Sequence, residues 1–419
     1  SGGIVGAGAG VDSKGTIDPT IEAKLGTSLT IKASGDVTVR ALSDQKSDVN
    51  SLGVAVAGGA AVGVSLANIT ATPTTSASIG DNSNITGQTL TVEAIATDSF
   101  EVESTAGSGA ILFSGAGANS SVTSSGAVNA SLGNSTVVRV DSLVLTSNAS
   151  QDADAKADAF AVGAVSGSGA VINNEVFPTS KVSIGSSANV AAAESVVITA
   201  LNKFEKDKYS TNLVSGSGGL GAVSVLKSET EIGKPDRFFE SAIDVGNNAT
   251  VIATGSYNNP AVFQMFAKNT VVAKDNVEVT TVGGFGVSDG KSLIDADTKS
   301  RINVQNKAKL MNYSGDLDLA TRNDVTNLPI TDILVVALIG GGKATAEGNT
   351  DAHNEITVDG AHLRGRDVYI KAGLDKRKAG NRLYTETYGR ITTPSPASVP
   401  LSDAISLTRE YNTIQINGS

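Results

Sequence analysis

The sequence predicts an all-β chain built as an elongated parallel β-solenoid, a right-handed β-helix. Three observations predict it: a strand-and-turn signature that returns at spacings of about 52–61 residues, strict alternation of apolar and polar residues within that signature, and the lack of any apolar stripe at helical spacing. An array of small β-sandwich domains is the alternative. It is less favoured because a sandwich of about 100 residues usually has aromatic core anchors, whereas aromatic residues make up 4% of this chain.

The repeat is marked by a turn signature of an apolar residue, a polar residue, a second apolar residue and a turn former. It reads AKLG at 23–26, ASIG at 77–80, ASLG at 130–133, VSIG at 182–185 and IDVG at 243–246, with weaker copies INVQ at 302–305, ITVD at 356–359 and IQIN at 414–417. The second apolar residues are Leu25, Ile79, Leu132, Ile184, Val245, Val304, Val358 and Ile416. We expect the closing glycines, such as Gly133, to adopt a positive φ at a corner of the chain.

A second alternating strand follows most of the turn signatures by about ten residues. Its copies are LTVEA at 90–94, LVLTS at 143–147, VVITA at 196–200, LDLAT at 317–321 and VYIKA at 368–372, and the first repeat carries two, LTIKA at 29–33 and VTVRA at 37–41. Because a parallel solenoid takes roughly 20 residues per coil, we expect two to three coils in each repeat.

Blocks of small residues recur between the second strand and the next turn signature. They include GVAVAGGAAVGVS at 53–65, AGSGAILFSGAGA at 106–118, AVGAVSGSGAV at 161–171, LVSGSGGLGAV at 213–223 and VGGFGV at 282–287. Glycine within a strand is unfavourable by about 0.5–1 kcal/mol relative to alanine, so its recurrence indicates close approach of another backbone layer. We expect these blocks to line the narrow side of the array, and a change of Ala164 or Gly167 to leucine to overpack the contact between layers.

The regularity of the repeats divides the chain into two parts. Residues 1–200 are predicted to form regular Gly/Ala-rich solenoid repeats, and residues 201–419 to continue the solenoid with less regular and more charged repeats. The small-residue stretch at 1–10 stands about as far before Leu25 as the block at 161–171 stands before Ile184. We therefore expect the chain to begin inside a repeat and to be an interior fragment of a longer protein.

Composition excludes several functional classes. A net charge of −10 makes nucleic acid an improbable partner, because phosphate binding needs a clustered basic surface. The lack of cysteine excludes disulfides, thiolate metal sites and cysteine nucleophiles, and it fits an exported protein. The apolar runs at 52–64 and 333–338 are too short to span a membrane.

Few residues suggest chemistry. The two histidines, His353 and His362, offer little material for a catalytic triad or a zinc site, and we predict that both lie in loops or at strand ends. Two pairs of aspartates, Asp152 with Asp154 and Asp295 with Asp297, each place two carboxylates on one strand face. Such pairs could bind calcium or stack across coils as the acid pair of a glycosidase, although alternating aspartate more often marks a solvated strand face.

Two further segments are distinctive. GGFGVSDGK at 283–291 approaches a calcium-binding nonapeptide, but Ser288 stands where that motif needs aspartate and Asp289 comes one position later. The basic run DKRK at 375–378, with Arg382, is predicted to be a charged turn. We therefore expect no catalytic or cofactor-binding residues, and calcium is the one cofactor that these motifs suggest.

Taken together, the ASIG-like corners, the LTVEA-like strands and the Gly/Ala blocks resemble the long repeat regions of giant secreted bacterial adhesins of the filamentous haemagglutinin and leukotoxin-like type. ASIG alone also resembles the head repeat of trimeric autotransporter adhesins, but that family repeats it at a much shorter interval than this chain does. The resemblance implies a non-catalytic extracellular shaft that spans distance and presents binding surfaces to a host, surface or polysaccharide ligand. Alternatives are a β-helical polysaccharide lyase or glycosidase, with its site between about 201 and 390, and a self-assembling extracellular fibre.

Overall fold

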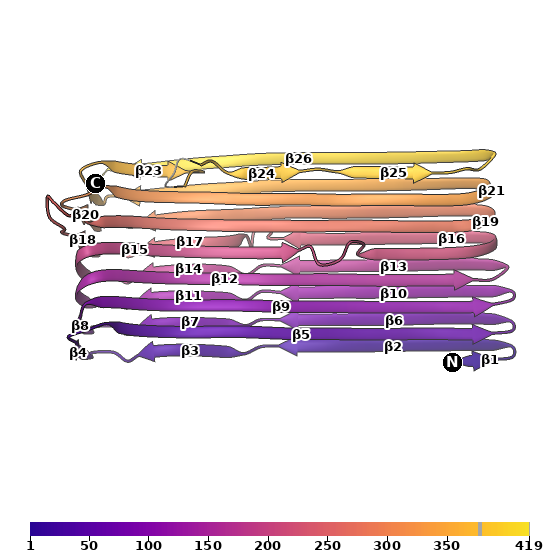
Figure 1. The fold of residues 1–419 in the computed structure, drawn as a ribbon, viewed down its shortest axis with the longest axis horizontal. Coiled ribbons are helices and arrows are strands. Elements are labelled where there is room, and N and C mark those ends of the chain that lie inside the picture. The colour runs from indigo at the N-terminus through magenta and orange to yellow at the C-terminus, as the bar shows by residue number, and fades with distance from the viewer. Residues whose placement is uncertain (376–378, 419) are drawn as a thin grey trace.

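The protein is a parallel β-solenoid of wide, flat coils (Figure 1). The structure, a computed structural model, describes residues 1–375 and 379–418. Over these residues all pairs of strands are parallel and no residue is helical, so the predicted fold class is confirmed and a chain of β-sandwich domains is not observed. None of the described residues forms a helix long and apolar enough to cross a membrane.

Each coil has three parts: a short corner strand, a long strand that runs the full width of the molecule, and a return path (Figure 1). The coil nearest the middle of the N-terminal half illustrates this order with β8 (Asn84–Thr86), β9 (Thr89–Ala110), β10 (Phe113–Ser124) and β11 (Ala127–Leu132). The chain reverses tightly between β9 and β10, and it turns more gradually around the corner strand at the other end of the coil.

The other strands repeat these parts. Corner strands are β4 (Thr30–Lys32), β18 (Thr250–Ala253), β20 (Lys309–Asn312) and β22 (His362–Arg364). Long strands are β5 (Val37–Ala57), β12 (Val137–Val162) and β15 (Asn189–Lys206), the last two including their corner strands, and the series β23 (Val368–Ala372), β24 (Arg382–Thr385) and β25 (Tyr388–Thr392). Return strands are β2 (Gly6–Ile17), β3 (Thr20–Leu25), β6 (Ala60–Ala71), β7 (Thr74–Ile79), β13 (Val165–Val176), β14 (Thr179–Ile184), β17 (Phe239–Val245) and β26 (Ala397–Asn417). Three strands bend through the reversal, β16 (Leu213–Ile232), β19 (Val262–Val304) and β21 (Leu317–Asp359), and β1 (Gly2–Gly3) pairs with the end of β5.

One sequence repeat makes one coil. The second apolar residues of the eight turn signatures stack directly on one another, each paired with the next: Leu25, Ile79, Leu132, Ile184, Val245, Val304, Val358 and Ile416. The predicted repeat is therefore confirmed, but the expectation of two to three coils per repeat is wrong. The long strands are about four times the length of a typical strand of five or six residues, so a single turn of the solenoid consumes the whole repeat.

The turn glycines are required by the neighbouring coil. Gly80, Gly133, Gly185 and Gly246 do not have positive φ, contrary to the sequence prediction; the left-handed residue comes two positions later, as at Asn82 (φ 57°). A Cβ on Gly133 would lie 2.6 Å from the backbone nitrogen of Asp81 in the adjacent turn. At the equivalent Gly26, in the first turn, an added Cβ would have no atom within 4 Å, so the close contact arises only where one turn stacks on another.

The interior changes character along the coil. At the corner end it is a continuous apolar core, in which Leu90, Val92 and Leu145 are completely buried. Toward the reversal the inward residues become small, as with Ser104 and Ala106 on β9. The two sheets accordingly come closer together at the reversal, because small side chains leave little space between them.

The small-residue blocks lie at this reversal, and their polar residues face inward while most of their larger apolar residues face outward. Serines face inward and bond across the thin interior, as between Ser108 and Ser114 (Oγ–Oγ 2.6 Å), whereas valines such as Val162 face outward. Close approach of two layers occurs at Gly63, where a Cβ would lie 2.3 Å from the Gly107 carbonyl oxygen. It does not occur at Gly167, whose Cβ would meet no atom within 4 Å, so the predicted overpacking at that position is wrong. Ala164 is half-buried in the turn itself.

A buried ion pair interrupts the apolar interior near the middle of the coil. Lys206 and Asp275 are both fully buried, with Nζ and Oδ1 3.0 Å apart. Thr230 accepts a second bond from Lys206, and Ser292 donates to the other carboxylate oxygen. Every strong partner is thus supplied from within the solenoid, which is the condition under which a buried charge is tolerated.

Candidate functional site: an acidic and aromatic patch

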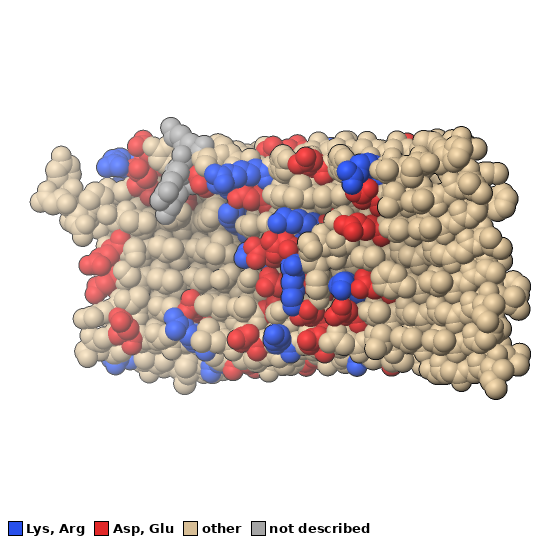
Figure 2. Space-filling model, turned by 45° about the vertical axis from the view of Figure 1, so that its right-hand side comes forward, with Lys and Arg blue, Asp and Glu red and all other residues tan. Residues whose placement is uncertain are grey.

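Charged side chains gather in a broad band across the middle of the outer surface (Figure 2). This follows from the alternation of the strands, because inward positions take the apolar and small residues and outward positions take the charges. Parallel stacking then places outward residues of successive repeats in columns. A functional group in this fold is therefore assembled from residues about one repeat apart.

The strongest cluster of functional side chains lies on the return strands of the C-terminal coils. We call it the acidic–aromatic patch, and it comprises Phe238, Asp295, Asp297, Lys299, Asp351, His353, Arg409 and Tyr411. Two columns form it. In one, Asp297 of β19 pairs with Asp351 of β21, which pairs with Arg409 of β26; in the other, Lys299, His353 and Tyr411 are stacked in the same order.

The carboxylates of the patch perturb one another. Burial, followed by the negative charges of Asp295 and Asp351, raises the pKa of Asp297 to about 7. The pKa of Asp295 is also raised, chiefly by burial. Asp351 is instead held by Arg409 in a bidentate pair, with Nε–Oδ1 2.5 Å and Nη2–Oδ2 2.6 Å. At neutral pH the column therefore contains a carboxyl group that is about half protonated beside one paired with a guanidinium group.

The aromatic rings form a continuous surface beside these carboxylates. The His353 ring is stacked on the Tyr411 ring, with centroids 4.5 Å apart and planes inclined by 8°, and it meets the edge of Phe238 at 5.1 Å. Burial lowers the pKa of His353, so its imidazole is neutral at pH 7. Tyr411 remains 44% exposed. Exposed rings can stack on the apolar face of a sugar, and neighbouring carboxylates can accept hydrogen bonds from its hydroxyl groups.

A turn preceding β17 completes the patch. Gly233 has φ 77°, and a Cβ there would lie 2.0 Å from the carbonyl oxygen of Asp297, so the turn packs directly on that strand. It carries Phe238 to His353, and Lys299 lies over the Phe238 ring at 5.7 Å. Asp297 is left only 6% exposed. A ligand could therefore contact the aromatic rings and Asp351, but it would reach little of the Asp297 side chain.

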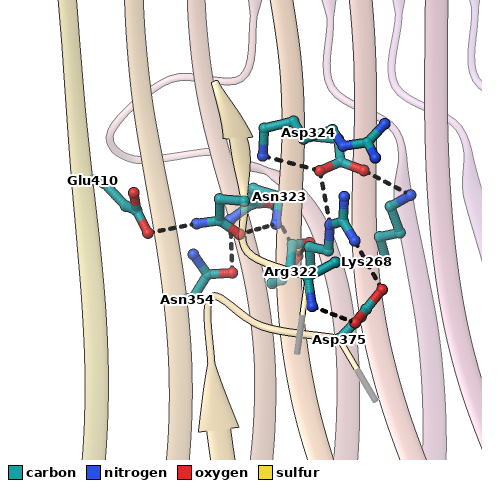
Figure 3. A network of polar contacts seen from close by, with 11 residues as sticks. Lys268, Arg322, Asn323, Asp324, Asn354, Asp375 and Glu410 are labelled. Atoms are coloured by element: carbon teal, nitrogen blue, oxygen red, sulfur yellow. Dashed lines mark hydrogen bonds and ion pairs between the residues drawn. The ribbon is translucent and has the colours of Figure 1, made fainter. Parts of the chain in front are cut away.

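A second polar cluster surrounds Arg322 on the long strands (Figure 3). Arg322 donates from Nε to Asp324 (2.8 Å) and from Nη1 to Asp375 (2.9 Å), and Lys268 approaches Asp324 from the preceding coil at 2.8 Å. The neighbouring Asn323 donates a hydrogen bond to the inward Asn354. Because Lys268, Arg322 and Asp375 come from three successive coils and are linked through these bonds, we interpret this cluster as a brace between coils.

The aspartate pairs predicted from sequence have different surroundings. Asp295 and Asp297 are brought together with Asp351, as the hypothesis of acids stacked across coils requires. Asp152 and Asp154 lie on β12, where burial raises the pKa of Asp154 to about 6 and the backbone N–H of Lys208 bonds to its carboxylate. Within the described part of the chain, no group of three or more histidine, cysteine, aspartate or glutamate residues is arranged to hold a metal ion.

The two histidines are not brought together. His353 is stacked between Lys299 and Tyr411, whereas His362 pairs with Lys309 on a corner strand, so the two lie in different columns. His362 is the first residue of β22, as predicted for a strand end. His353 lies well inside β21, so the same prediction is wrong there, because the long strand continues through the whole return path.

The two distinctive segments are not binding loops in the described structure. In residues 283–291 the chain reverses at Gly284 and is extended from Phe285 onward, and Ser288 faces inward onto Thr281, so Ser288 and Asp289 lie on a strand and not in a calcium-binding turn. Of the predicted basic turn, Lys376, Arg377 and Lys378 lie outside the described residues. Asp375 binds Arg322, and the backbone N–H of Arg382 bonds to Asp324.

Sequence reasoning missed Asp351, Arg409 and Tyr411 as members of a site. Their signal was present, because Asp297, Asp351 and Arg409 follow one another at the same spacing as Val304, Val358 and Ile416. No protein-family model, curated protein or solved structure matches the chain.

Proposed function

We propose that the chain is a non-catalytic structural segment of an extracellular bacterial adhesive protein, and that its broad faces present a binding surface for polysaccharide. The observation that carries the proposal is the column of eight stacked turn residues, because in-register coils give a rigid slab with continuous outer faces. The resemblance to giant secreted adhesins and the lack of cysteine support the extracellular setting.

The coil geometry favours presentation of surface over reach. Adjacent coils are about 4.8 Å apart, so each repeat adds little length. The same repeat adds one row to the outer face, and in β9 this row is 22 residues wide. The acidic–aromatic patch is the part of that face best suited to a sugar, because Tyr411 is exposed and stacked on a neutral imidazole.

Binding to immobilised neutral and anionic polysaccharides, measured by biolayer interferometry, tests the proposal. The parent protein should bind, and Tyr411→Ala should weaken binding at least about tenfold, because a ring stacked on a sugar is lost. Tyr384→Ala is the matched control, since Tyr384 is also exposed but lies on β24. Equal binding by parent, Tyr411→Ala and Tyr384→Ala variants would contradict the assignment of the patch.

A hydrolase or lyase is the second candidate, and one observation favours it. The Asp297 carboxyl, with its pKa of about 7, lies in the same column as Asp351, which is paired with Arg409, and two carboxyl groups in different surroundings are the arrangement that glycosidases use. The burial of Asp297 and the bidentate pairing of Asp351 argue against it. Release of reducing ends or unsaturated products, lost in Asp297→Asn while binding persists, would support the enzyme.

A further inference from the structure

The reversal end of the solenoid has an apolar outer surface on two faces and at its tip. We define this apolar end by four outward columns: those that contain Val54 and Val56 on the long strands, and those that contain Ala60 and Val62 on the return strands. Their members are valine, leucine, isoleucine, phenylalanine, alanine, glycine and threonine. The large ones are exposed, including Val162 at 64% and Phe285 at 63%.

On the long strands, charges limit the apolar end at one column in four of the seven coils, and Leu52, Thr105 and Val214 occupy that column in the other three. The charged members of the column are Asp158, Glu278, Asp332 and Arg390, and the columns beyond it toward the tip carry no charge. Figure 2 shows this as a sharp boundary, with charged side chains absent from the right-hand end of the visible face. A straight boundary across successive coils indicates one planar environment rather than scattered apolar residues.

Most buried hydroxyl groups at the apolar end bond to one another inside the solenoid, although that of Ser166 has no partner. Hydroxyl groups face inward in pairs, such as Ser217 with Ser224 (2.8 Å) and Thr281 with Ser288 (2.7 Å). Backbone groups of the tip bond between coils, as from Leu112 N–H to the Gly59 carbonyl (3.2 Å). Such satisfaction of backbone groups is what a water-free surrounding requires.

The shape of the apolar end selects its occupant. Seven stacked residues at about 4.8 Å, from Val54 to Thr392, and a depth of about 17 Å give each face roughly 600 Å². That is less than the roughly 800 Å² that each partner buries in a stable protein interface. A second copy placed on one face would also leave the other face and tip residues such as Ile111 and Leu220 exposed. The hydrocarbon of a lipid layer, being fluid, can cover both faces and the tip at once.

We propose that the apolar end inserts into the hydrocarbon layer of one leaflet of a lipid membrane, with the charged column at the headgroups. From Asp158 to the reversal at Gly163 there are five residues, or about 17 Å, close to half of the roughly 30 Å hydrocarbon thickness of a bilayer. The long strands then stand steeply on the membrane and hold the acidic–aromatic patch above it. Insertion does not depend on the proposed polysaccharide binding.

Flotation with phosphatidylcholine vesicles tests insertion. The parent should float with the vesicles, and Val56→Glu/Val162→Glu should partition at least about tenfold less, because a charge at hydrocarbon depth is costly. Leu42→Glu is the matched control: Leu42 is exposed on the same strand as Val56 but lies outside the apolar end, so this variant should float like the parent. All three replaced positions are exposed, and circular dichroism should confirm that every variant is folded.

A single tryptophan provides a second readout, because the chain has none. Leu112→Trp at the tip should show blue-shifted emission and quenching by bromine-labelled acyl chains when vesicles are added, and Leu42→Trp should show neither. Failure of the parent to float, or equal flotation of the glutamate variant, would overturn the proposal. A blue shift without lipid, accompanied by a concentration-dependent mass in sedimentation, would show instead that a second copy covers the apolar end.

Discussion

Glycine acts in this solenoid mainly through the atoms of the neighbouring coil. Gly80, Gly133 and Gly185 share a turn position, and at each of them a Cβ would lie within 2.7 Å of an atom in the preceding turn. A contact shorter than 3 Å forces the backbone to move, whereas a position in open space accepts a side chain. The loss of stability on replacing a glycine is therefore set by the atoms of the adjacent coil that its new side chain would meet.

The first prediction concerns the turn. Gly133→Ala should lower the free energy of unfolding by about 1–3 kcal/mol, because the added methyl group overlaps Asp81. Gly26→Ala is the control and should change it by less than about 0.5 kcal/mol, since no atom lies within 4 Å. Urea denaturation measures both, and equal destabilisation would show that backbone angle, rather than stacking, demands glycine.

The second prediction concerns the small-residue blocks. Gly63→Ala should destabilise by about 1–3 kcal/mol because its Cβ points at the Gly107 carbonyl between the two sheets. Gly167→Leu, in open space on the outer face, should leave thermal stability nearly unchanged. If Gly167→Leu lowered the stability more than Gly63→Ala, the assignment of inward and outward positions in the block would be wrong.

The third prediction concerns Asp297 and pH. In the folded protein the Asp297 carboxyl has a pKa of about 7, whereas an unperturbed aspartate has a pKa of 3.8. Stability should therefore fall as pH rises from about 4 through 7. Asp297→Asn should reduce that loss by about 1 kcal/mol or more between about pH 5 and pH 8.

The pH slope should not vanish in the variant, because Asp98 and Asp154, each with a pKa of about 6, act in the same direction. Asp12→Asn, at a solvent-facing position of β2, should keep the slope of the parent. Urea titrations at several pH values provide the test. An Asp297→Asn variant with the slope of the parent would place the proton elsewhere.

At the scale of elements, β15 and β19 are joined through the buried pair of Lys206 and Asp275. Lys206→Met should destabilise by about 3–5 kcal/mol, because it leaves a buried carboxylate without its cation. Lys206→Met/Asp275→Leu should recover most of the loss, since an apolar pair needs no charge partner. Chemical denaturation of the single and double variants decides this, and an equally unstable double variant would show that shape rather than charge is limiting.

Individual strands were predicted more successfully than their inward and outward faces. Alternation identified β9 and β12 because large apolar residues alternate with polar ones at their starts. Within 161–171 valine alternates with serine, glycine and alanine, so neither face is distinctly polar and the sequence alone could not say that Val162 points outward. The strand copy at Phe263–Ala267 was missed because residues 254–261 displace it from the expected spacing.

At the scale of the whole molecule, the repeat was predictable but the width of the coil was not. A period-two pattern identifies strands without saying how many share a turn, and only the pairing of Leu90 with Leu143 shows that a coil takes a full repeat. The acidic–aromatic patch was hidden for the same reason, since Asp297 and Arg409 meet only when the correct coil length is known.

The coil length leads to a prediction about deletion. Removing residues 90–142 brings Leu143 into the place of Leu90, so the shortened chain should fold and lose about 4.8 Å along the stacking direction. Small-angle scattering and electron microscopy should show an unchanged coil width. A loss of two or three times that length would mean that more than one coil had been removed.

The constant register limits how such a gene can change. One codon added within β9 would turn every later inward residue of that strand outward, burying glutamates and exposing alanines. Additional residues between strands have no such effect: the chain carries 207–212 and 254–261 between strands, and Val245 and Val304 still return to their column. We expect insertions and deletions among natural variants to fall at these junctions, so that surface loops diversify while the stacked strands keep their length.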